Sequence, residues 1–407
     1  MFKNLKKQNS VMFDIIYGIV TAVFFSAFIY LAHYGFVIKI LNTILAISSL
    51  ALFLYAPKRA VLIAGFSVGL LWFYWIGYSF KYQGVGYIAP VVTFGFAVIY
   101  MLFFGVLALS REPYIRAVLL FGLSFFEPFD WNWLQIELIF VDSYIGIFKY
   151  QLALILFSLS LPFYLKKYRF APLLLILCAL NFAQPKQYDA PLRIKLIQTN
   201  IKQDKKWLRE TLRPTILLIY KEILDATKEG YDVVVFPESV FPLYMNRNPV
   251  LIEQLQRLSR NITIIAGTLF IENKKHYNVT YMFKNGNYEI AKKIVLVPFG
   301  EYIPLPKFAR NFINEALFSG QSDFVAAKNP TDFVIKGIKF RNAICYEATC
   351  QEIYNGDVKF VIASSNNAWF APSIESTLQK LLMEYYARKN GVTIYHSANY
   401  QGTGVIK

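Results

Sequence analysis

The sequence predicts two parts of different fold class: a multi-span α-helical membrane domain over residues 1–187 and an α/β domain over residues 188–407. Three observations support this division. The 407 residues are 56% apolar but only 17% charged, whereas a typical soluble domain carries about 25% charged residues. The apolar runs long enough to cross a bilayer lie in the first part. In the second part, short β-rich runs alternate with helical patterns, which is typical of layered α/β domains.

Composition also excludes several classes of protein. The apolar content is too high for a disordered chain, and three cysteines cannot build a disulfide scaffold. The net charge of +16 does not indicate nucleic-acid binding, because the aromatic-basic motifs of those folds are missing. The histidines are too scattered for a metal site, and the sequence lacks a Gly-rich phosphate loop. We therefore expect no metal and no cofactor.

We expect about seven membrane-spanning helices, because each needs about 20 mostly apolar residues. The candidate runs are residues 11–32, 36–55, 60–79, 89–110, 117–126 together with part of the segment after it, 146–165 and 170–184. The fifth run is interrupted by Glu127, Pro128 and Asp130, and the seventh is short and contains Pro172. The number of crossings therefore depends on these two runs.

The distribution of positive charge predicts the orientation in the membrane. With the N-terminus in the cytoplasm, ten basic residues fall on the inner side. They are Lys3, Lys6, Lys7, Lys58, Arg59, Arg111, Arg116, Lys166, Lys167 and Arg169. The outer side collects only Lys39, Lys81 and Lys149. Seven crossings then place residues 188–407 outside the cytoplasm.

Alternating strands and helices are expected in the second part. Buried strands are predicted at residues 194–198 and 232–236, with an amphipathic helix at 211–228 between them. Further strands are predicted at residues 261–268, 277–284, 292–297, 333–335, 341–345, 358–363, 393–397 and 403–406, and a further helix at 376–389.

Polar residues at the carboxyl ends of buried strands tend to line the ligand site of an α/β sheet. Glu238 follows one predicted strand, Lys293 opens another stretch, and Cys345 ends a third. Each alone has an ordinary explanation, as a cap, a solvated lysine or a small core side chain. Together and in this order, they resemble the carbon–nitrogen hydrolase (nitrilase) superfamily.

Longer motifs narrow this resemblance. They are Gln198-Thr199-Asn200-Ile201 followed by Lys206-Trp207, Phe236-Pro237-Glu238-Ser239, residues 296–305, Cys345-Tyr346-Glu347 and residues 365–370. With these motifs the second part resembles the apolipoprotein N-acyltransferases, the membrane-embedded branch of the nitrilase superfamily. The apolar first part fits the layout of that family. The resemblance implies a nitrilase-like domain with a four-layer α-β-β-α sandwich.

Thiol chemistry and the resemblance together imply catalytic roles. A thiol is a weak nucleophile at its free pKa of about 8.5, so Cys345 needs a base, and Glu238 is expected to serve. Lys293 is expected to stay protonated and to stabilise an oxyanion, with the backbone N–H of Tyr346 as a second donor. Glu301 is expected to orient Lys293.

Other residues are candidates for supporting roles. Glu347 lies two residues after Cys345, so on a strand both side chains share one face. Tyr346 and Trp207 resemble family residues near the substrate channel, with ordinary aromatic packing as the alternative. Trp369, in the last motif, is a further candidate for substrate binding.

The resemblance implies a two-step acyl transfer. A phospholipid, expected to be phosphatidylethanolamine, donates an acyl chain to Cys345 as a thioester, and the α-amine of a diacylated apolipoprotein then accepts it. The resemblance places the catalytic domain in the periplasm at a bacterial inner membrane. Trp75 and Tyr82, on the predicted outer side, either help form the lipid entry or belong to an interfacial aromatic belt.

Two other functions are weighed against this one. A membrane-anchored nitrilase-type amidase that hydrolyses a small amide would use the same three residues, and differs in taking water as the acceptor. A non-catalytic membrane scaffold with a decayed nitrilase domain is the other, and the intact set of Glu238, Lys293 and Cys345 argues against it.

The chain also departs from the family pattern. Asn367 and Ala371 stand where the family motif has Asp and Gly, and residues 375–380 replace a segment that contains histidine. The chain stops at Lys407, where the family normally continues into a last membrane helix, so that helix is expected to be absent. These changes bear on acceptor docking more than on the chemistry.

Overall fold

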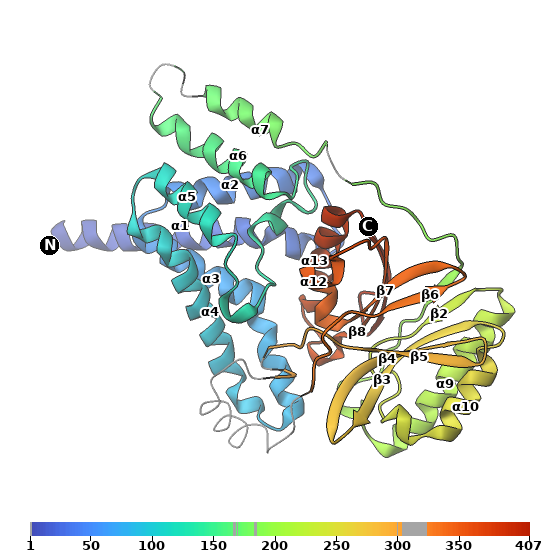
Figure 1. Ribbon diagram of the computed structural model, residues 1–407. Helices are drawn as coiled ribbons and strands as arrows, with labels where there is room; N and C mark the ends of the chain where they lie inside the picture. The colour runs from blue at the N-terminus through green and yellow to red at the C-terminus, as the bar shows by residue number, and fades with distance from the viewer. Residues whose placement is uncertain (1, 166–167, 169, 183–184, 299, 303–323) are drawn as a thin grey trace. The chain divides into compact units, whose positions relative to one another are not determined.

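The computed structural model divides the chain into two compact units, Met1–Gln184 and Pro185–Lys407 (Figure 1). The residues that it describes are 2–165, 168, 170–182, 185–298, 300–302 and 324–407. Some expectations from the sequence lie outside the described residues. These are the basic residues Lys166, Lys167 and Arg169, the end of the seventh apolar run, and Phe299, Ile303, Pro304 and Leu305 of the 296–305 motif.

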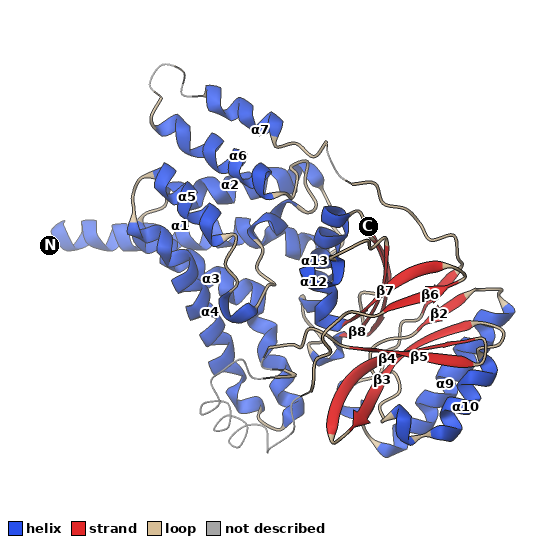
Figure 2. Ribbon diagram, viewed as in Figure 1, coloured by secondary structure: helices blue, strands red, loops and turns tan. Residues whose placement is uncertain are grey.

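The first unit is helical because its sequence consists of long apolar runs (Figure 2). Its α-helices are α1 (Phe2–His33), α2 (Lys39–Tyr55), α3 (Lys58–Phe73), α4 (Ala89–Gly105), α5 (Pro113–Leu123), α6 (Lys149–Ser160) and α7 (Leu175–Cys178). Among the described residues, three helical stretches are long and apolar enough to cross a membrane: Ser10–His33, Lys58–Gln83 and Gly86–Leu109. The shorter apolar helices are Lys39–Tyr55, Pro113–Leu123 and Lys149–Phe163.

The fifth and seventh apolar runs form shorter helices than the sequence predicts. α5 ends at Leu123. Pro128 disfavours the helical conformation at Glu127, so the helix cannot continue through this segment. The seventh run forms a 3-10 turn, Ala171–Leu174, followed by the four residues of α7. The orientation that rests on seven crossings therefore stays a prediction.

The second unit contains two five-stranded sheets. The first has the order β1 (Ile194–Leu196), β2 (Val233–Val235), β3 (Thr263–Glu272), β4 (Lys275–Lys284) and β5 (Asn287–Lys292). The second has the order β10 (Gly404–Ile406), β9 (Thr393–Asn399), β8 (Phe360–Asn366), β7 (Ile338–Ile344) and β6 (Asp332–Ile335). In each sheet three neighbouring strands are parallel, β1–β2–β3 and β7–β8–β9, and the other two strands pair antiparallel.

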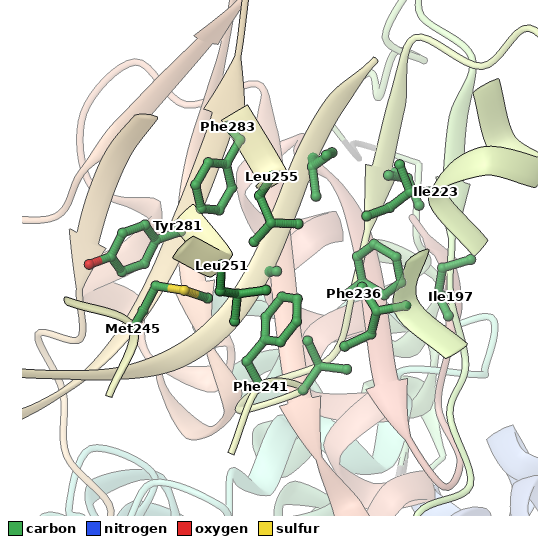
Figure 3. Packing of buried hydrophobic residues seen from close by; sticks show 14 of the residues in the cluster. Ile197, Ile223, Phe236, Phe241, Met245, Leu251, Leu255, Tyr281 and Phe283 are labelled. Atoms are coloured by element: carbon green, nitrogen blue, oxygen red, sulfur yellow. The ribbon is translucent and has the colours of Figure 1, made fainter. Parts of the chain in front are cut away.

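Two helices cover one face of the first sheet. They are α9 (Arg209–Lys228), which the sequence predicts, and α10 (Pro249–Leu258), which it does not. Both bury apolar side chains against the sheet, and Ile223 and Leu255 pack in one cluster with Phe236 (Figure 3). The amphipathic pattern of both helices explains why only one face of each is buried.

The two sheets pack on each other through a second apolar core. Val235 and Ile265 of the first sheet share it with Phe340 and Ile362 of the second. Two helices, α12 (Gln351–Tyr354) and α13 (Glu375–Asn390), pack against the second sheet (Figures 1 and 2). The order of layers is therefore helix, sheet, sheet, helix, and the expected four-layer sandwich is confirmed.

The expected strand at residues 292–297 is wrong. β5 ends at Lys292, where its pairing with β4 stops. The chain then leaves the sheet, because the backbone N–H groups of the two residues after Lys293 donate to the carboxylate of Glu347 (2.8 and 3.2 Å) rather than to a strand. Lys293 therefore follows a strand, as Glu238 and Cys345 do.

Candidate active site

Glu238 follows β2, and a close approach of β3 fixes its backbone. All of β2 is buried, so the chain leaves the core only after Pro237. A Cβ at Gly267 of β3 would lie 2.5 Å from the backbone nitrogen of Ser239 and 2.7 Å from the Cα of Glu238. Because real Cβ atoms do not come that close, this turn requires a glycine at position 267. The side chain of Glu238 is itself buried.

One amide group holds two carboxylates of the site. Nδ2 of Asn278, on β4, donates to Oε1 of Glu238 (2.7 Å) and to Oε1 of Glu301 (3.1 Å). The other oxygen of Glu301 accepts the backbone N–H of Val297 (2.9 Å). Since the amide nitrogen donates and the carboxyl oxygens accept, these bonds fix the orientation of both side chains.

Lys293 is a buried ammonium paired with Glu301. Its Nζ lies 2.7 Å from Oε2 of Glu301, and its side chain is 1% exposed. Burial lowers the pKa of Lys293, but the negative charge of Glu301, and then that of Glu238, outweighs burial and holds the pKa above its ordinary value. Lys293 therefore carries a positive charge throughout the neutral pH range.

Cys345 follows β7 in a strained conformation. Its φ is 56°, a value that residues other than glycine rarely adopt, and Cys345–Thr349 form a one-turn 3-10 helix. The expectation that Glu347 and Cys345 share a strand face is therefore wrong. The carboxylate of Glu347 instead accepts the backbone N–H of Ile344 (2.7 Å). Glu347 thus ties the cysteine turn to the segment after Lys293.

The charges of Glu238 and Lys293 both act on the sulfur. Burial raises the pKa of the Cys345 thiol well above its ordinary value; the negative charge of Glu238 raises it further, and the positive charge of Lys293 lowers it. The thiol is therefore protonated at rest, and a base must take its proton before the sulfur can attack. The structure thus brings together three residues that follow different strands.

Lys206 is a second buried lysine of the site, and the motif alone gives it no role. Its Nζ donates to the backbone oxygen of Glu238 (3.0 Å), and the side chain is 2% exposed. Burial lowers the pKa of Lys206 to about 8, against the opposing effect of the charges of Glu238 and Cys345. The only sequence signal for Lys206 is its place directly before Trp207.

The segment after β8 is joined to Lys206 through Asn366. One end of the Asn366 side-chain amide lies 3.1 Å from Nζ of Lys206 and 3.2 Å from the indole nitrogen of Trp369. Both of these neighbours are donors, so an oxygen at this end accepts from both, whereas a nitrogen there donates to Oε1 of Gln203 (2.9 Å). On α13, Nε2 of Gln379 lies 3.9 Å from Sγ of Cys345. Periodicity cannot single out such polar side chains, because they meet only in the folded chain.

Two family models and a close relative cover almost the whole chain. Residues 12–182 match the apolipoprotein N-acyltransferase integral membrane domain, and residues 193–401 match the carbon-nitrogen hydrolase model. The apolipoprotein N-acyltransferase of Wolinella succinogenes is 41% identical over 388 residues, which are 95% of this chain and 94% of the relative. The chain belongs to the apolipoprotein N-acyltransferase family.

A second relative agrees with this placement. The apolipoprotein N-acyltransferase of Helicobacter pylori is 37% identical over 375 residues, 90% of this chain and 87% of the relative. Among solved structures, a CN-hydrolase superfamily protein from Xanthomonas campestris is 16% identical, with a TM-score of 0.39 over 52% of this chain and 76% of that chain. As a member of the apolipoprotein N-acyltransferase family, the chain is a multi-pass membrane protein and an acyltransferase.

The candidates for substrate binding lie in different surroundings. In the second unit, Trp207 is 46% exposed, Trp369 is half-buried and Tyr346 is buried. In the helical unit, Trp75 is buried, and its indole N–H donates to the backbone oxygen of Trp72 (2.7 Å). Tyr82 is half-buried in the 3-10 segment that comes after α3. The burial of Trp75 favours packing inside the helical unit over contact with lipid.

Proposed function

We propose that this chain moves a fatty acyl chain from a phospholipid, by way of a thioester on Cys345, to the α-amine of the N-terminal diacylglyceryl-cysteine of an apolipoprotein. Phosphatidylethanolamine is the proposed donor. The observation that carries the proposal is that the 41% identity to a named apolipoprotein N-acyltransferase extends over both units. An amidase for small amides has no need of the membrane unit, so that alternative is not favoured.

In the first half-reaction, Glu238 takes the thiol proton of Cys345, and the sulfur attacks the ester carbonyl of the phospholipid. Lys293 and the backbone N–H of Tyr346 stabilise the oxyanion that forms. The ester C–O bond then breaks, Glu238 returns the proton to the leaving alkoxide, and a lysophospholipid departs. The dependence of the thiol pKa on both Glu238 and Lys293 supports these assignments.

In the second half-reaction, the free amine of the apolipoprotein attacks the thioester on Cys345. A C–N bond forms and the C–S bond breaks, while Glu238 carries a proton from the amine to the sulfur. Lys293 stabilises the second oxyanion with the same charge, since its ion pair with Glu301 keeps it protonated. The product is an apolipoprotein with an amide-linked third acyl chain.

We further propose that residues 188–407 face the periplasm at the inner membrane, and that residues 1–187 carry the chain through it. The excess of basic residues on one side of the predicted spans supports this orientation. Moving each CH₂ of an acyl chain from lipid into water costs about 0.8 kcal/mol, so the chain must reach Cys345 from the bilayer. The exposed ring of Trp207, next to buried Lys206, is a proposed contact for the substrate.

Mass spectrometry of the purified full-length protein tests the proposal. Incubation with phosphatidylethanolamine should add one acyl chain to Cys345, and a diacylated lipopeptide should then remove it and gain an amide. Cys345→Ser should abolish the adduct, and Glu238→Gln should slow its formation by about 100-fold or more. Cys178→Ser, which removes an exposed cysteine, should leave it unchanged. Release of the acyl chain to water instead of the lipopeptide would favour the amidase.

A further inference from the structure

Glu375 is a buried carboxylic acid that the proposed chemistry leaves unused. It begins α13, and its side chain is 2% exposed. Among the described residues, its carboxylate has no hydrogen-bond or ion-pair partner. Burial without a counter-ion favours the neutral form of a carboxyl group, so Glu375 is protonated at rest, and its carboxyl group is available to a ligand.

The position of Glu375 on α13 brings it near Cys345, the proposed nucleophile. Gln379 lies four residues later on the same helix, and its Nε2 is 3.9 Å from Sγ of Cys345. Residues four apart on a helix are neighbours on one face, with Cβ atoms about 5–6 Å apart. Glu375 therefore stands one turn from the residue that contacts the reacting sulfur.

Electrostatics supports this placement. Burial and then the charge of Glu238 raise the pKa of Glu375 well above its ordinary value, and Glu375 is in turn one of the groups that raise the pKa of Cys345. Both lysines of the site are already engaged, Lys293 with Glu301 and Lys206 with a backbone carbonyl. A cation that enters beside Glu375 would meet a carboxyl group without a counter-ion.

We propose that Glu375 is the subsite that receives the α-ammonium group of the acceptor and takes its first proton; this inference rests on the proposed function. An α-amine has a pKa of about 7.7–8.0 in water, so at neutral pH it arrives mostly as an ammonium and cannot attack. A carboxyl group of raised proton affinity is matched to an amine of this kind. The phospholipid brings no amine to the reacting carbonyl and does not need this subsite.

The protons balance over the second half-reaction. Glu375 is protonated at rest. The positive charge of the acceptor favours the ionised form of this carboxyl group, so Glu375 gives its proton to water as R–NH₃⁺ enters and then takes one proton from R–NH₃⁺, which leaves R–NH₂. The amine attacks the thioester, and the second proton passes through Glu238 to the sulfur of Cys345 as the C–S bond breaks. The product amide keeps one N–H. Glu375 ends the reaction protonated, as it is at rest.

The two half-reactions, measured separately on the full-length enzyme, test the inference. We expect Glu375→Gln to form the Cys345 thioester from phosphatidylethanolamine within about twofold of the wild-type rate. Transfer from the preformed thioester to a diacylated lipopeptide should fall by about tenfold or more, as for loss of a general base. Transfer to hydroxylamine, which is uncharged at pH 7, should be unchanged. Glu352→Gln, an exposed carboxyl on α12, should match the wild type in all three.

Other results would overturn the inference. Equal lipopeptide transfer in Glu375→Gln and the wild type would show that the carboxyl group is not needed. A parallel fall in all three rates would assign Glu375 to the folding of α13. If Glu375→Gln does not fold, Glu375→Asp keeps the charge on a shorter side chain and should raise the KM for the lipopeptide while acylation stays normal. If the wild type forms no thioester, the proposed function fails, and not the subsite alone.

Discussion

Two lysines lie within the site, and their pKa values shift in opposite directions. Lys293 is paired with the carboxylate of Glu301, and its pKa lies above the ordinary value. Lys206 donates to a backbone carbonyl, and burial lowers its pKa to about 8. A charged partner offsets the desolvation of an ammonium, and a neutral carbonyl does so far less. Lys293 is therefore a permanent charge, while Lys206 changes its charge just above neutral pH.

This difference predicts how the reactivity of Cys345 depends on pH. Below about pH 8 Lys206 is charged, and its charge lowers the pKa of the Cys345 thiol. Above about pH 8 Lys206 is neutral and no longer lowers that pKa. Lys206→Met should therefore slow alkylation of Cys345 by iodoacetamide at pH 7 by about tenfold, as for a pKa shift of one unit. Lys206→Arg stays charged, so it should keep the wild-type alkylation rate at pH 7 and should also lower the thiol pKa above pH 8. Identical profiles for Lys206→Met and the wild type would assign Lys206 to packing alone.

At the scale of elements, the site depends on where strands end. Glu238 follows β2, Lys293 follows β5 and Cys345 follows β7, so one polar cluster draws on both sheets of the sandwich. The turn at Glu238 can form because β3 presents Gly267 to it. Packing between a strand and a turn therefore positions a catalytic group.

Substitution of Gly267 tests this dependence. Gly267→Ala places a Cβ 2.5 Å from the backbone of the Glu238 turn, so the turn must move. A shift of about 1 Å in a catalytic group can cost about 100-fold in rate, and we expect a loss of this size in thioester formation. Gly95→Ala on α4, where an added Cβ meets nothing within 4 Å, is the control. Normal acylation by Gly267→Ala would contradict the role of this contact.

The sequence predicts those parts of the fold that depend on local patterns. The strands that precede Glu238 and Cys345 are found because buried parallel strands are continuous apolar runs. The end of β5 before Lys293 is not predicted, since it depends on pairing with β4 and on hydrogen bonds to the carboxylate of Glu347, which is distant in the sequence. Asn278 and Lys206 are missed for a similar reason: their partners are far away in the sequence, and one polar residue in a strand or loop gives no periodic signal.

At the scale of the whole molecule, the chain joins a helical membrane unit to a unit with the layers of a soluble enzyme. Both substrates of the proposed reaction are lipids, and the proposed acceptor is itself anchored in the membrane. The proposed chemistry therefore requires the catalytic unit on the side where the acceptor is found. The charge asymmetry of the loops is the sequence feature that decides that side.

Labelling of introduced cysteines tests the predicted orientation. In a Cys178→Ser, Cys345→Ser background, a membrane-impermeant maleimide added to intact spheroplasts should label Lys275→Cys in the catalytic unit and Tyr87→Cys between the third and fourth runs. Lys58→Cys, on the predicted inner side, should react only after the membrane is permeabilised. All three side chains are exposed. The reverse pattern would place the catalytic unit in the cytoplasm and would rule out the proposed substrates.

The carboxylate of Glu347 has a mechanical consequence. It accepts one amide that precedes Cys345, at the end of the second sheet, and two that come after β5 of the first. One side chain thus links the two sheets at the point where the sulfur of Cys345 and the ammonium group of Lys293 must keep a fixed distance. Movement of one sheet past the other at this point would break hydrogen bonds to Glu347, so these bonds hold the spacing of the reacting groups.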